Sequence, residues 1–379
     1  MMSEIILSVI FTFLLAYYLF FISDIFRGLG KLRKKDSCRI PDEYVSVIIP
    51  FRNERENLSE NLRTLEEQNY PKEKFEIIYV NDSSTDDSVD VLVRNKKGDN
   101  VKIISVPESF SPNAHKKRAI KFGIENAAGE IIVTTDADCI YGKDWLSSLL
   151  NYFDVDTAFI SGPVKFKNNG KLFNKLQEIE FAGLVITGAG LIGINKPAIC
   201  NAANIAYRKK VFEEVKGFND RLDLSSGDDE LLMQKIWKET KYEIRFCTDK
   251  KAIVETAPNY SLIQFYQQRK RWASKGLFYA NKLLILKLVL IFFFYLSLTI
   301  ELLVGIFFSL KFLFVFLITF FLKASAEFLV LKRGTNLLFE QEIMQPFILA
   351  EILHIPYIVI VAISGLFGNF TWKERKISR

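Results

Sequence analysis

Three stretches of sequence, each a short β-branched run that ends in polar residues, decide the fold. They are VSVIIPFRNE (residues 45–54), IIYVNDSSTDDS (77–88) and VTTDADC (133–139). Helix-like segments lie between them, such as residues 57–69, where Leu58, Leu62 and Leu65 recur on one helix face. Strands that alternate with helices at this spacing predict an α/β fold, with a mainly parallel sheet flanked by helices.

The composition narrows the class of protein. The 379 residues are 49% hydrophobic, and the mean hydropathy of +0.13 is too high for a purely soluble chain. Two histidines leave little material for a His-rich metal site or a Ser/His/Asp hydrolase, so the chemistry is expected to use carboxylates. The 50 Lys and Arg residues nearly balance the 44 Asp and Glu residues, so the chain lacks the excess of basic residues that is typical of nucleic-acid-binding proteins. Four single cysteines argue against a disulfide framework and a zinc site: Cys38, Cys139, Cys200 and Cys247.

The N-terminal apolar run, residues 5–22, is long enough to cross a membrane as a helix. Basic residues follow the run instead of preceding it, which favours an uncleaved anchor over a signal peptide. The same charges place the next domain in the cytoplasm. We therefore predict a transmembrane anchor at residues 1–23 and a cytoplasmic domain at residues 24–282.

The C-terminal region, residues 283–379, is predicted to hold about three apolar spans, at residues 283–308, 312–331 and 347–367. The protein is thus expected to be integral to a membrane, the cell membrane of a bacterium. Charged residues inside these runs are expected to face protein or water. They are Glu301, Lys323 and Glu327. The alternative is that Lys287 and Lys323 only snorkel near the helix ends.

The basic tail leaves the topology open. Four spans would put the tail outside, whereas its Lys and Arg residues favour the inside. Either residues 347–367, which Pro356 interrupts, form a re-entrant segment, or a short tail overrides the charge rule. Residues 172–194 also allow two interpretations, a helix along the membrane interface or a packed core helix and loop.

Acidic residues follow the strands, where α/β sheets bind ligands. Asp136 and Asp138 come directly after a buried strand, and two carboxylates at one point repel each other unless a cation lies between them. Their oxygens suit Mg²⁺ or Mn²⁺ held together with substrate phosphates. Residues 81–84 alone would be compatible with an ordinary turn or helix cap.

Taken together, the motifs resemble those of the inverting family 2 glycosyltransferases, which have the nucleotide-sugar-binding GT-A fold. The resemblance covers about residues 45–272 in the family's order. Besides the three opening stretches, it rests on Lys116, Ala119, Ile120, NAAN (201–204), Tyr207, Arg208, GDDE (227–230) and QRKRW (268–272). The last motif resembles the Q(Q/R)xRW signature of membrane-embedded cellulose, hyaluronan and chitin synthases.

The resemblance implies a nucleotide-diphospho-sugar donor, expected to be UDP-linked. Glu54 and Asp82 would bind the base and ribose, and Lys116 would lie near the diphosphate. Asp136 matches the family's ribose or metal-shell carboxylate, and Asp138 matches the direct metal ligand, for Mg²⁺ or Mn²⁺.

The resemblance also assigns the general base to Asp229, with its neighbour Asp228 as a rival. The alternative is that both are capping acids of a helix at residues 231–240. Inversion follows from one displacement opposite the diphosphate.

The family's acceptor-side residues match positions in QRKRW. Trp272 would stack on the acceptor sugar, while Gln268 and Arg271 would approach the acceptor or the diphosphate. The alternative is a basic, aromatic helix at lipid headgroups, a role to which Arg269 and Lys270 are assigned.

The expected function is membrane-bound inverting transfer of a sugar to a lipid-linked or growing glycan acceptor. A processive polysaccharide synthase is the alternative, but Asn81 replaces the usual first Asp, the base motif lacks Thr-Glu, and a gating loop is missing. A nucleotidyltransferase is a less favoured alternative, because it would not need QRKRW and because no Gly-rich phosphate loop follows the first predicted strand. An inactive scaffold would be expected to have lost Asp138 or Asp229, but the sequence retains both.

Overall fold

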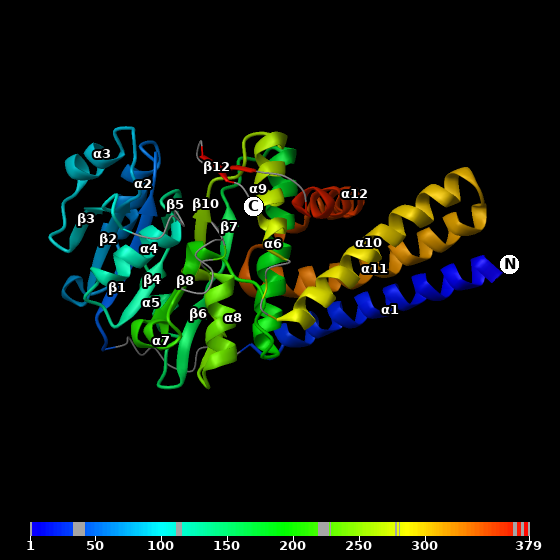
Figure 1. The fold of residues 1–379 in the computed structure, drawn as a ribbon, viewed down its shortest axis with the longest axis horizontal. Helices are drawn as coiled ribbons and strands as arrows, with labels where there is room; N and C mark the ends of the chain where they lie inside the picture. The colour runs from blue at the N-terminus through cyan, green and yellow to red at the C-terminus, as the bar shows by residue number, and fades with distance from the viewer. Residues whose placement is uncertain are drawn as a thin grey trace.

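The computed structural model describes residues 2–32, 42–110, 116–218, 227, 229–276, 279, 281–366, 370–372 and 375–377. A seven-stranded sheet forms one half of the molecule, with strand order β3-β2-β1-β4-β8-β6-β9 (Figure 1). These strands are β1 (Val45–Phe51), β2 (Phe75–Asn81), β3 (Val101–Ser105), β4 (Ile131–Thr134), β6 (Thr157–Ser161), β8 (Ile205–Arg208) and β9 (Glu243–Phe246). Strands β1 to β4 are parallel, and β8 runs antiparallel to both its neighbours. The predicted α/β fold with a mainly parallel sheet is confirmed.

The register of the sheet aligns the ends of its central strands. Phe51 pairs with Asn81, and Ile48 pairs with Thr134. Every residue of β2 and β4 is buried, as expected for strands covered by helices on both faces. The polar residues that follow β1, β2 and β4 therefore gather at one edge of the sheet.

Short helices and a small second sheet complete the α/β domain. The helices are α2 (Leu58–Glu66), α3 (Ser88–Asn95), α4 (Lys116–Glu125), α5 (Trp145–Leu150), α7 (Lys209–Glu214) and α8 (Glu230–Glu239). The small sheet contains β5 (Cys139–Tyr141), β10 (Val254–Thr256) and β7 (Val164–Phe166). A hairpin of β11 (Phe370–Trp372) and β12 (Arg375–Ile377) lies near the C-terminus.

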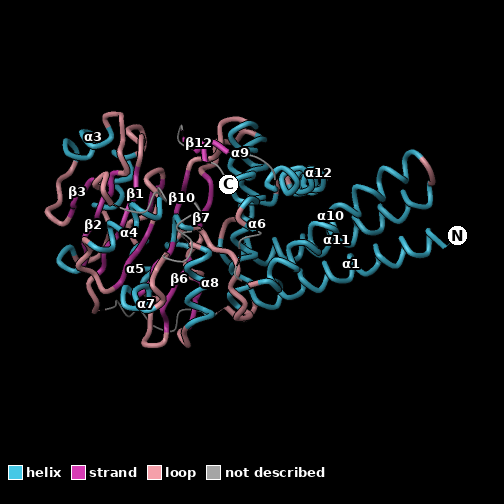
Figure 2. Tube along the Cα trace, viewed as in Figure 1, coloured by secondary structure: helices cyan, strands magenta, loops and turns pink. Residues whose placement is uncertain are grey.

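The other half of the molecule is helical (Figure 2). Helices α1 (Met2–Leu29), α10 (Lys282–Phe307) and α11 (Leu310–Leu338) form a bundle that projects away from the sheets. Helices α6 (Leu172–Gly193), α9 (Leu262–Ser274) and α12 (Phe347–Leu366) lie between the bundle and the sheets. The apolar runs predicted as spans are thus helical, and their crossing of a membrane stays a prediction.

Five helices of the described residues are long and apolar enough to span a membrane, namely α1, α6, α10, α11 and α12. Helix α6 differs from the others because 67% of its most apolar window is buried inside the protein, against 22–28% elsewhere. It packs closely on α1, where a Cβ atom on Gly28 would lie 1.8 Å from the carbonyl oxygen of Gly190. Of the two interpretations of residues 172–194, the structure favours the packed helix.

The three charged residues that were expected to face protein or water are buried in the protein. Glu301 and Lys323 are fully buried, and Glu327 is nearly so. The Lys323 ammonium lies 2.8 Å from the carboxylate of Glu327 and 2.5 Å from that of Glu351. Lys323 therefore does not snorkel, because its charge is paired inside the bundle.

Candidate functional site

Lys116, Asp136 and Asp138 meet at the edge of the sheet beyond β4. The Nζ atom of Lys116 lies 2.6 Å from Oδ1 of Asp136. Asp138 accepts a hydrogen bond of 3.2 Å from the Thr256 hydroxyl, which comes from β10. Burial, together with the nearby charge of Asp136, raises the pKa of Asp138. Both carboxylates thus lie beyond the same strand, and the negative charge of Asp136 disfavours ionisation of Asp138.

Asp82 follows β2 at the same edge and is buried. Its Oδ1 atom accepts a hydrogen bond of 3.1 Å from Nη2 of Arg118. No motif in the sequence marks Arg118, although it follows Lys116 by two residues. Arg118 therefore fixes one oxygen of the Asp82 carboxylate at the wall of the site.

The loops after β1 and β2 are tied to each other. Arg52 donates hydrogen bonds to the backbone carbonyls of Asp82 and Ser83, at 3.1 and 2.8 Å. Asn53 and Ser83 both have positive φ angles, which turn the chain sharply after each strand. Glu54 accepts a hydrogen bond of 2.8 Å from the side chain of Asn57.

Asn81, which stands where the family usually has Asp, has a structural partner. Its Oδ1 atom accepts a hydrogen bond of 2.9 Å from the backbone N–H of Ser84. The ordinary-turn interpretation of residues 81–84 is therefore correct for Asn81, while Asp82 points into the site.

Asp229 caps the N-terminus of α8 and is buried. Its Oδ1 accepts from the N–H of Glu230 at 2.8 Å, and its Oδ2 accepts from the N–H of Ala202 at 2.9 Å. The capping alternative thus describes the local geometry correctly. The bond to Ala202 also joins the GDDE motif to the NAAN motif. Asp228 lies outside the described residues.

Glu230 connects α8 to the end of α9. Its Oε2 atom lies 3.2 Å from Nζ of Lys275 and accepts a hydrogen bond of 2.6 Å from the hydroxyl of Tyr279. Burial and Asp229 raise the pKa of Glu230, and Glu230 raises the pKa of Lys275 although burial acts against it. No local pattern in the sequence marks this pair, because its members lie 45 positions apart.

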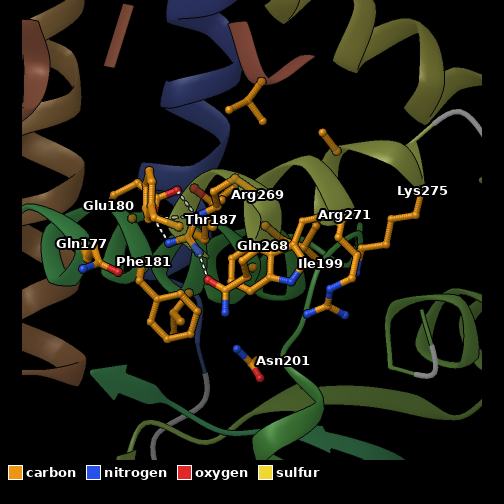
Figure 3. Close-up of a pocket in the computed structure, with 18 of the residues that line it drawn as sticks. Gln177, Glu180, Phe181, Thr187, Ile199, Asn201, Gln268, Arg269, Arg271 and Lys275 are labelled. Carbon is orange, nitrogen blue, oxygen red and sulfur yellow. Dashed lines mark hydrogen bonds and ion pairs between the residues drawn. The ribbon is translucent and has the colours of Figure 1, made fainter. Parts of the chain in front are cut away.

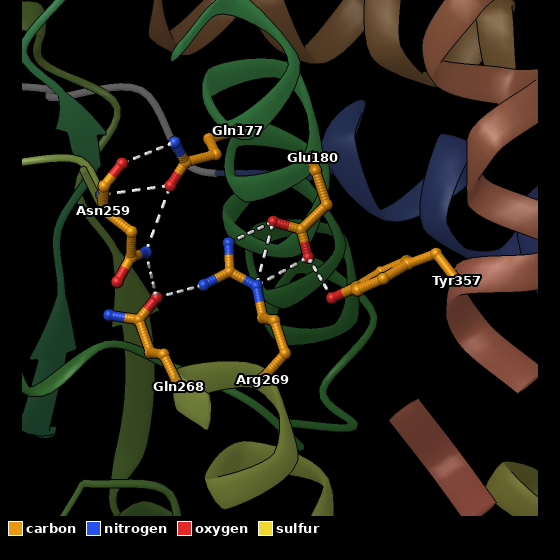
Figure 4. Close-up of polar contacts among 6 residues, drawn as sticks. All are labelled: Gln177, Glu180, Asn259, Gln268, Arg269 and Tyr357. Carbon is orange, nitrogen blue, oxygen red and sulfur yellow. Dashed lines mark hydrogen bonds and ion pairs between the residues drawn. The ribbon is translucent and has the colours of Figure 1, made fainter. Parts of the chain in front are cut away.

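Helix α9 carries QRKRW, and its residues take part in a buried polar network (Figure 4). Gln268 accepts hydrogen bonds from Asn259, at 2.9 Å, and from Arg269. Arg269 donates to Glu180 of α6 at 3.0 Å, and Glu180 also accepts from the hydroxyl of Tyr357 of α12 at 3.0 Å. These bonds link α6, α9 and α12.

Arg269 does not face lipid headgroups, which corrects the alternative drawn from the sequence. Its side chain is only 2% exposed, and its guanidinium lies 4.2 Å from the ring centroid of Trp272. The ring of Phe181 is 6.0 Å from that of Trp272. Arg269 is therefore a structural partner of the motif, because both its charge and its planar face are used inside the protein.

One cavity of about 1710 Å³ brings the two sides together. Every predicted site residue that the structure describes lines it: Glu54, Asp82, Lys116, Asp136, Asp138, Asp229, Gln268, Arg271 and Trp272. Figure 3 shows the part of the wall that α6 and α9 supply, with Arg271 and Lys275 on α9 and its C-terminal end. The cavity continues between α10 and α12, where Phe292 and Ile360 line it. A polar ligand bound at the strand ends would thus be open to an apolar path among the helices.

The chain is similar in sequence to known glycosyltransferases. The sequence profile of Glycosyl transferase family 2 matches residues 46–216. Glycosyltransferase AglE of Haloferax volcanii is 29% identical over 191 residues, which are 49% of this chain and 59% of that protein. Poly-beta-1,6-N-acetyl-D-glucosamine synthase of Staphylococcus epidermidis is 24% identical over 264 residues, 68% of this chain and 60% of the synthase. The alignments thus span about three fifths of these relatives' lengths.

The fold also matches a solved structure. Mannosyltransferase PcManGT from Pyrobaculum calidifontis, in complex with GDP-Man and Mn²⁺, superposes with a TM-score of 0.61 at 18% identity. The match covers 96% of this chain and 99% of that chain. Residues 46–216 therefore match the model of glycosyl transferase family 2, in a chain that combines a GT-A-like α/β domain with long apolar helices.

Proposed function

We propose that the protein is a membrane-bound inverting glycosyltransferase that moves a sugar from a nucleotide-diphospho-sugar to a lipid-linked or growing glycan acceptor. The observation that carries the proposal is the single cavity, which joins the carboxylates of the sheet edge to Asp229 and to the QRKRW helix. The similarity to AglE and to the Staphylococcus epidermidis synthase supports it.

The donor binds at the edge of the sheet. Glu54 and Asp82 accept hydrogen bonds from the base and ribose, and Arg118 orients Asp82 for this contact. Lys116 supplies a positive charge beside the diphosphate. We propose a UDP-sugar, and a GDP-sugar is the competing donor because the mannosyltransferase of similar fold was solved with GDP-Man.

Asp136 and Asp138 suit a divalent cation, Mg²⁺ or Mn²⁺. Among the described residues, no group of three or more His, Cys, Asp or Glu side chains is arranged to hold a metal. Two carboxylates therefore fit a cation only if the donor's phosphate oxygens complete its shell, which is how Mg²⁺ is usually bound. A bound cation would neutralise the charge that develops on the leaving nucleoside diphosphate.

Asp229 acts as the general base. Each of its carboxylate oxygens accepts one backbone N–H and keeps a further lone pair for the acceptor hydroxyl. The two bonds fix the carboxylate, so the proton it takes comes from a hydroxyl in one defined position. Attack from the side opposite the diphosphate inverts the anomeric carbon in one step.

The acceptor lies against α9. Trp272 packs on a sugar face, and Gln268 and Arg271 bind hydroxyl or phosphate oxygens. An acceptor with a lipid tail fits the apolar continuation of the cavity between α10 and α12. We place the α/β domain in the cytoplasm, because basic residues follow the apolar run of α1.

A processive polysaccharide synthase is the second candidate. The specific observations in its favour are QRKRW and the similarity to the synthase of Staphylococcus epidermidis. The size of the product distinguishes the two candidates, since a single transfer adds one sugar and a synthase yields a polymer.

The test is nucleotide release by the detergent-purified protein from a panel of UDP- and GDP-sugars, with Mn²⁺ and lipid extract as acceptor. Asp138→Ala and Asp229→Asn are compared with Asp156→Asn, a matched control because Asp156 is exposed. We expect lipid-dependent release that both site variants abolish and the control retains. Activity that survives both substitutions would contradict the assignment of the site.

A further inference from the structure

Helix α12 crosses the three-helix bundle instead of joining it. Figure 1 shows α12 nearly end-on, whereas α1, α10 and α11 run lengthwise across the same view. A fourth span would run alongside the other three, because all would cross the same hydrocarbon layer. The direction of α12 is therefore unlike that of a transmembrane helix of this bundle.

Three polar residues on one face of α12 hold it against its neighbours. Glu351 accepts a hydrogen bond of 2.5 Å from Lys323 of α11, and Nδ1 of His354 lies 3.3 Å from the hydroxyl of Tyr295 of α10. Tyr357 donates to Glu180 of α6. Spaced three residues apart, they form a stripe that faces the protein.

The positions of these partners set the depth of α12. The α10–α11 turn marks the end of the bundle that is far from the α/β domain (Figure 1). Tyr295 lies thirteen residues before Phe308 at this turn, and Lys323 lies thirteen residues after Leu310, where α11 begins. At 1.5 Å per residue, the bundle extends about 20 Å beyond α12. This is less than the ~30 Å of a hydrocarbon core, so α12 lies at a depth within the leaflet nearer the α/β domain.

The outward face of α12 is apolar. Its exposed side chains include Ile348, Ile352 and Ile363, none of which lines the cavity. In water this surface would be a long hydrophobic stripe, whereas lipid acyl chains would cover it at no cost.

We infer that α12 is a membrane-surface helix, which lies in the leaflet next to the α/β domain with its outward face against lipid and does not cross the bilayer. The C-terminal tail then lies on the same side as the α/β domain. The basic tail, whose charge conflicts with four spans, agrees with this topology. The inference rests on the proposed embedding of the protein in a membrane.

Three single-cysteine additions to the full chain test the topology. Ser309→Cys marks the α10–α11 turn, Ser378→Cys marks the tail, and Asp156→Cys marks the α/β domain. Cells are treated with a membrane-impermeant maleimide before and after permeabilisation, and the parent chain with its own cysteines is the blank. We expect Ser378→Cys to label under the same condition as Asp156→Cys, and Ser309→Cys under the other.

Labelling of Ser378→Cys together with Ser309→Cys would overturn the inference, because α12 would then cross the membrane. An alkaline carbonate wash of the membranes distinguishes a wrong topology for α12 from a protein that is not embedded in the membrane at all. Release of the protein by the wash would overturn both, whereas retention with the opposite labelling pattern would overturn the topology alone.

Discussion

The two sides of the cavity differ in how their polar residues come together. At the sheet edge, Asp82 follows β2 directly, and Asp136 and Asp138 come within four residues of the end of β4. Lys116 and Arg118, the cationic partners of Asp136 and Asp82, lie in the first turn of α4. On the helical side, the bond between Arg269 and Glu180 joins residues 89 positions apart, and that between Tyr357 and Glu180 joins residues 177 apart. The sheet edge is thus assembled by local motifs, and the helical side by packing.

The two sides also differ in burial. Asp136 at the sheet edge is 34% exposed, whereas Arg269 on the helical side is 2% exposed. Removing a charge at the edge leaves its partner in reach of water, but removing one among the helices leaves a buried charge unpaired. Substitutions should therefore affect chemistry at the edge and both stability and acceptor binding among the helices.

The largest effect is expected from Asp138→Ala. Loss of a proposed metal ligand removes several kcal/mol of charge stabilisation, so transfer should fall by about 10³-fold or more. The melting temperature should change little, because Asp138 has one side-chain hydroxyl partner, Thr256. Nucleotide release and thermal unfolding in detergent measure the two effects. If the variant kept a tenth of the activity, Asp138 would not be a metal ligand in the donor site.

Asp229→Asn should lower turnover by about 10²-fold or more, the usual contribution of a general base. The amide can still accept one of the two backbone N–H bonds but not both, so a small loss of stability should accompany it. Donor affinity, measured by titration of the nucleotide, should stay near that of the parent. A loss of donor binding equal to the loss of turnover would instead indicate that Asp229 has only a structural role.

Glu180→Gln should destabilise the protein by about 3–5 kcal/mol, because the buried charge of Arg269 would lose its partner. The measurement is the rate of thermal inactivation in detergent. Glu340→Gln is the matched control, since Glu340 pairs with Lys165 but is half exposed. Replacing both partners, with Glu180→Leu and Arg269→Met, should recover much of the stability. No recovery would show that the ion pair is not the cause.

The smallest effect is expected from Tyr357→Phe, which removes one hydrogen bond to a carboxylate and no ring contact. Such a bond contributes about 1.5–3 kcal/mol. If α12 positions α9 through Glu180, the KM for the acceptor should rise several-fold while the KM for the donor stays constant. If the KM values for donor and acceptor changed equally, the contacts of α12 would not be specific to acceptor binding.

The residues of the two sides show how far sequence analysis reaches. The sheet and the gathering of Glu54, Asp82 and Asp136 followed from strand ends, because parallel strands place their carboxyl ends together. Arg118 was missed because nothing in a helical pattern tells which of its polar residues turns toward a neighbouring strand. Arg269 was assigned to headgroups because a basic residue near an apolar segment gives no sign of a buried partner.

The sequence by itself determined the alternation of strands and helices, the acidic residues at the strand ends and the apolar segments, because each depends on neighbours within a few residues. Only the tertiary structure decided that Lys323 pairs with Glu351, that Glu180 holds Arg269 and that α12 crosses the bundle. Those contacts depend on how each helix is rotated about its axis and on the angle at which helices cross. Both are set by close packing between segments that are far apart in the chain.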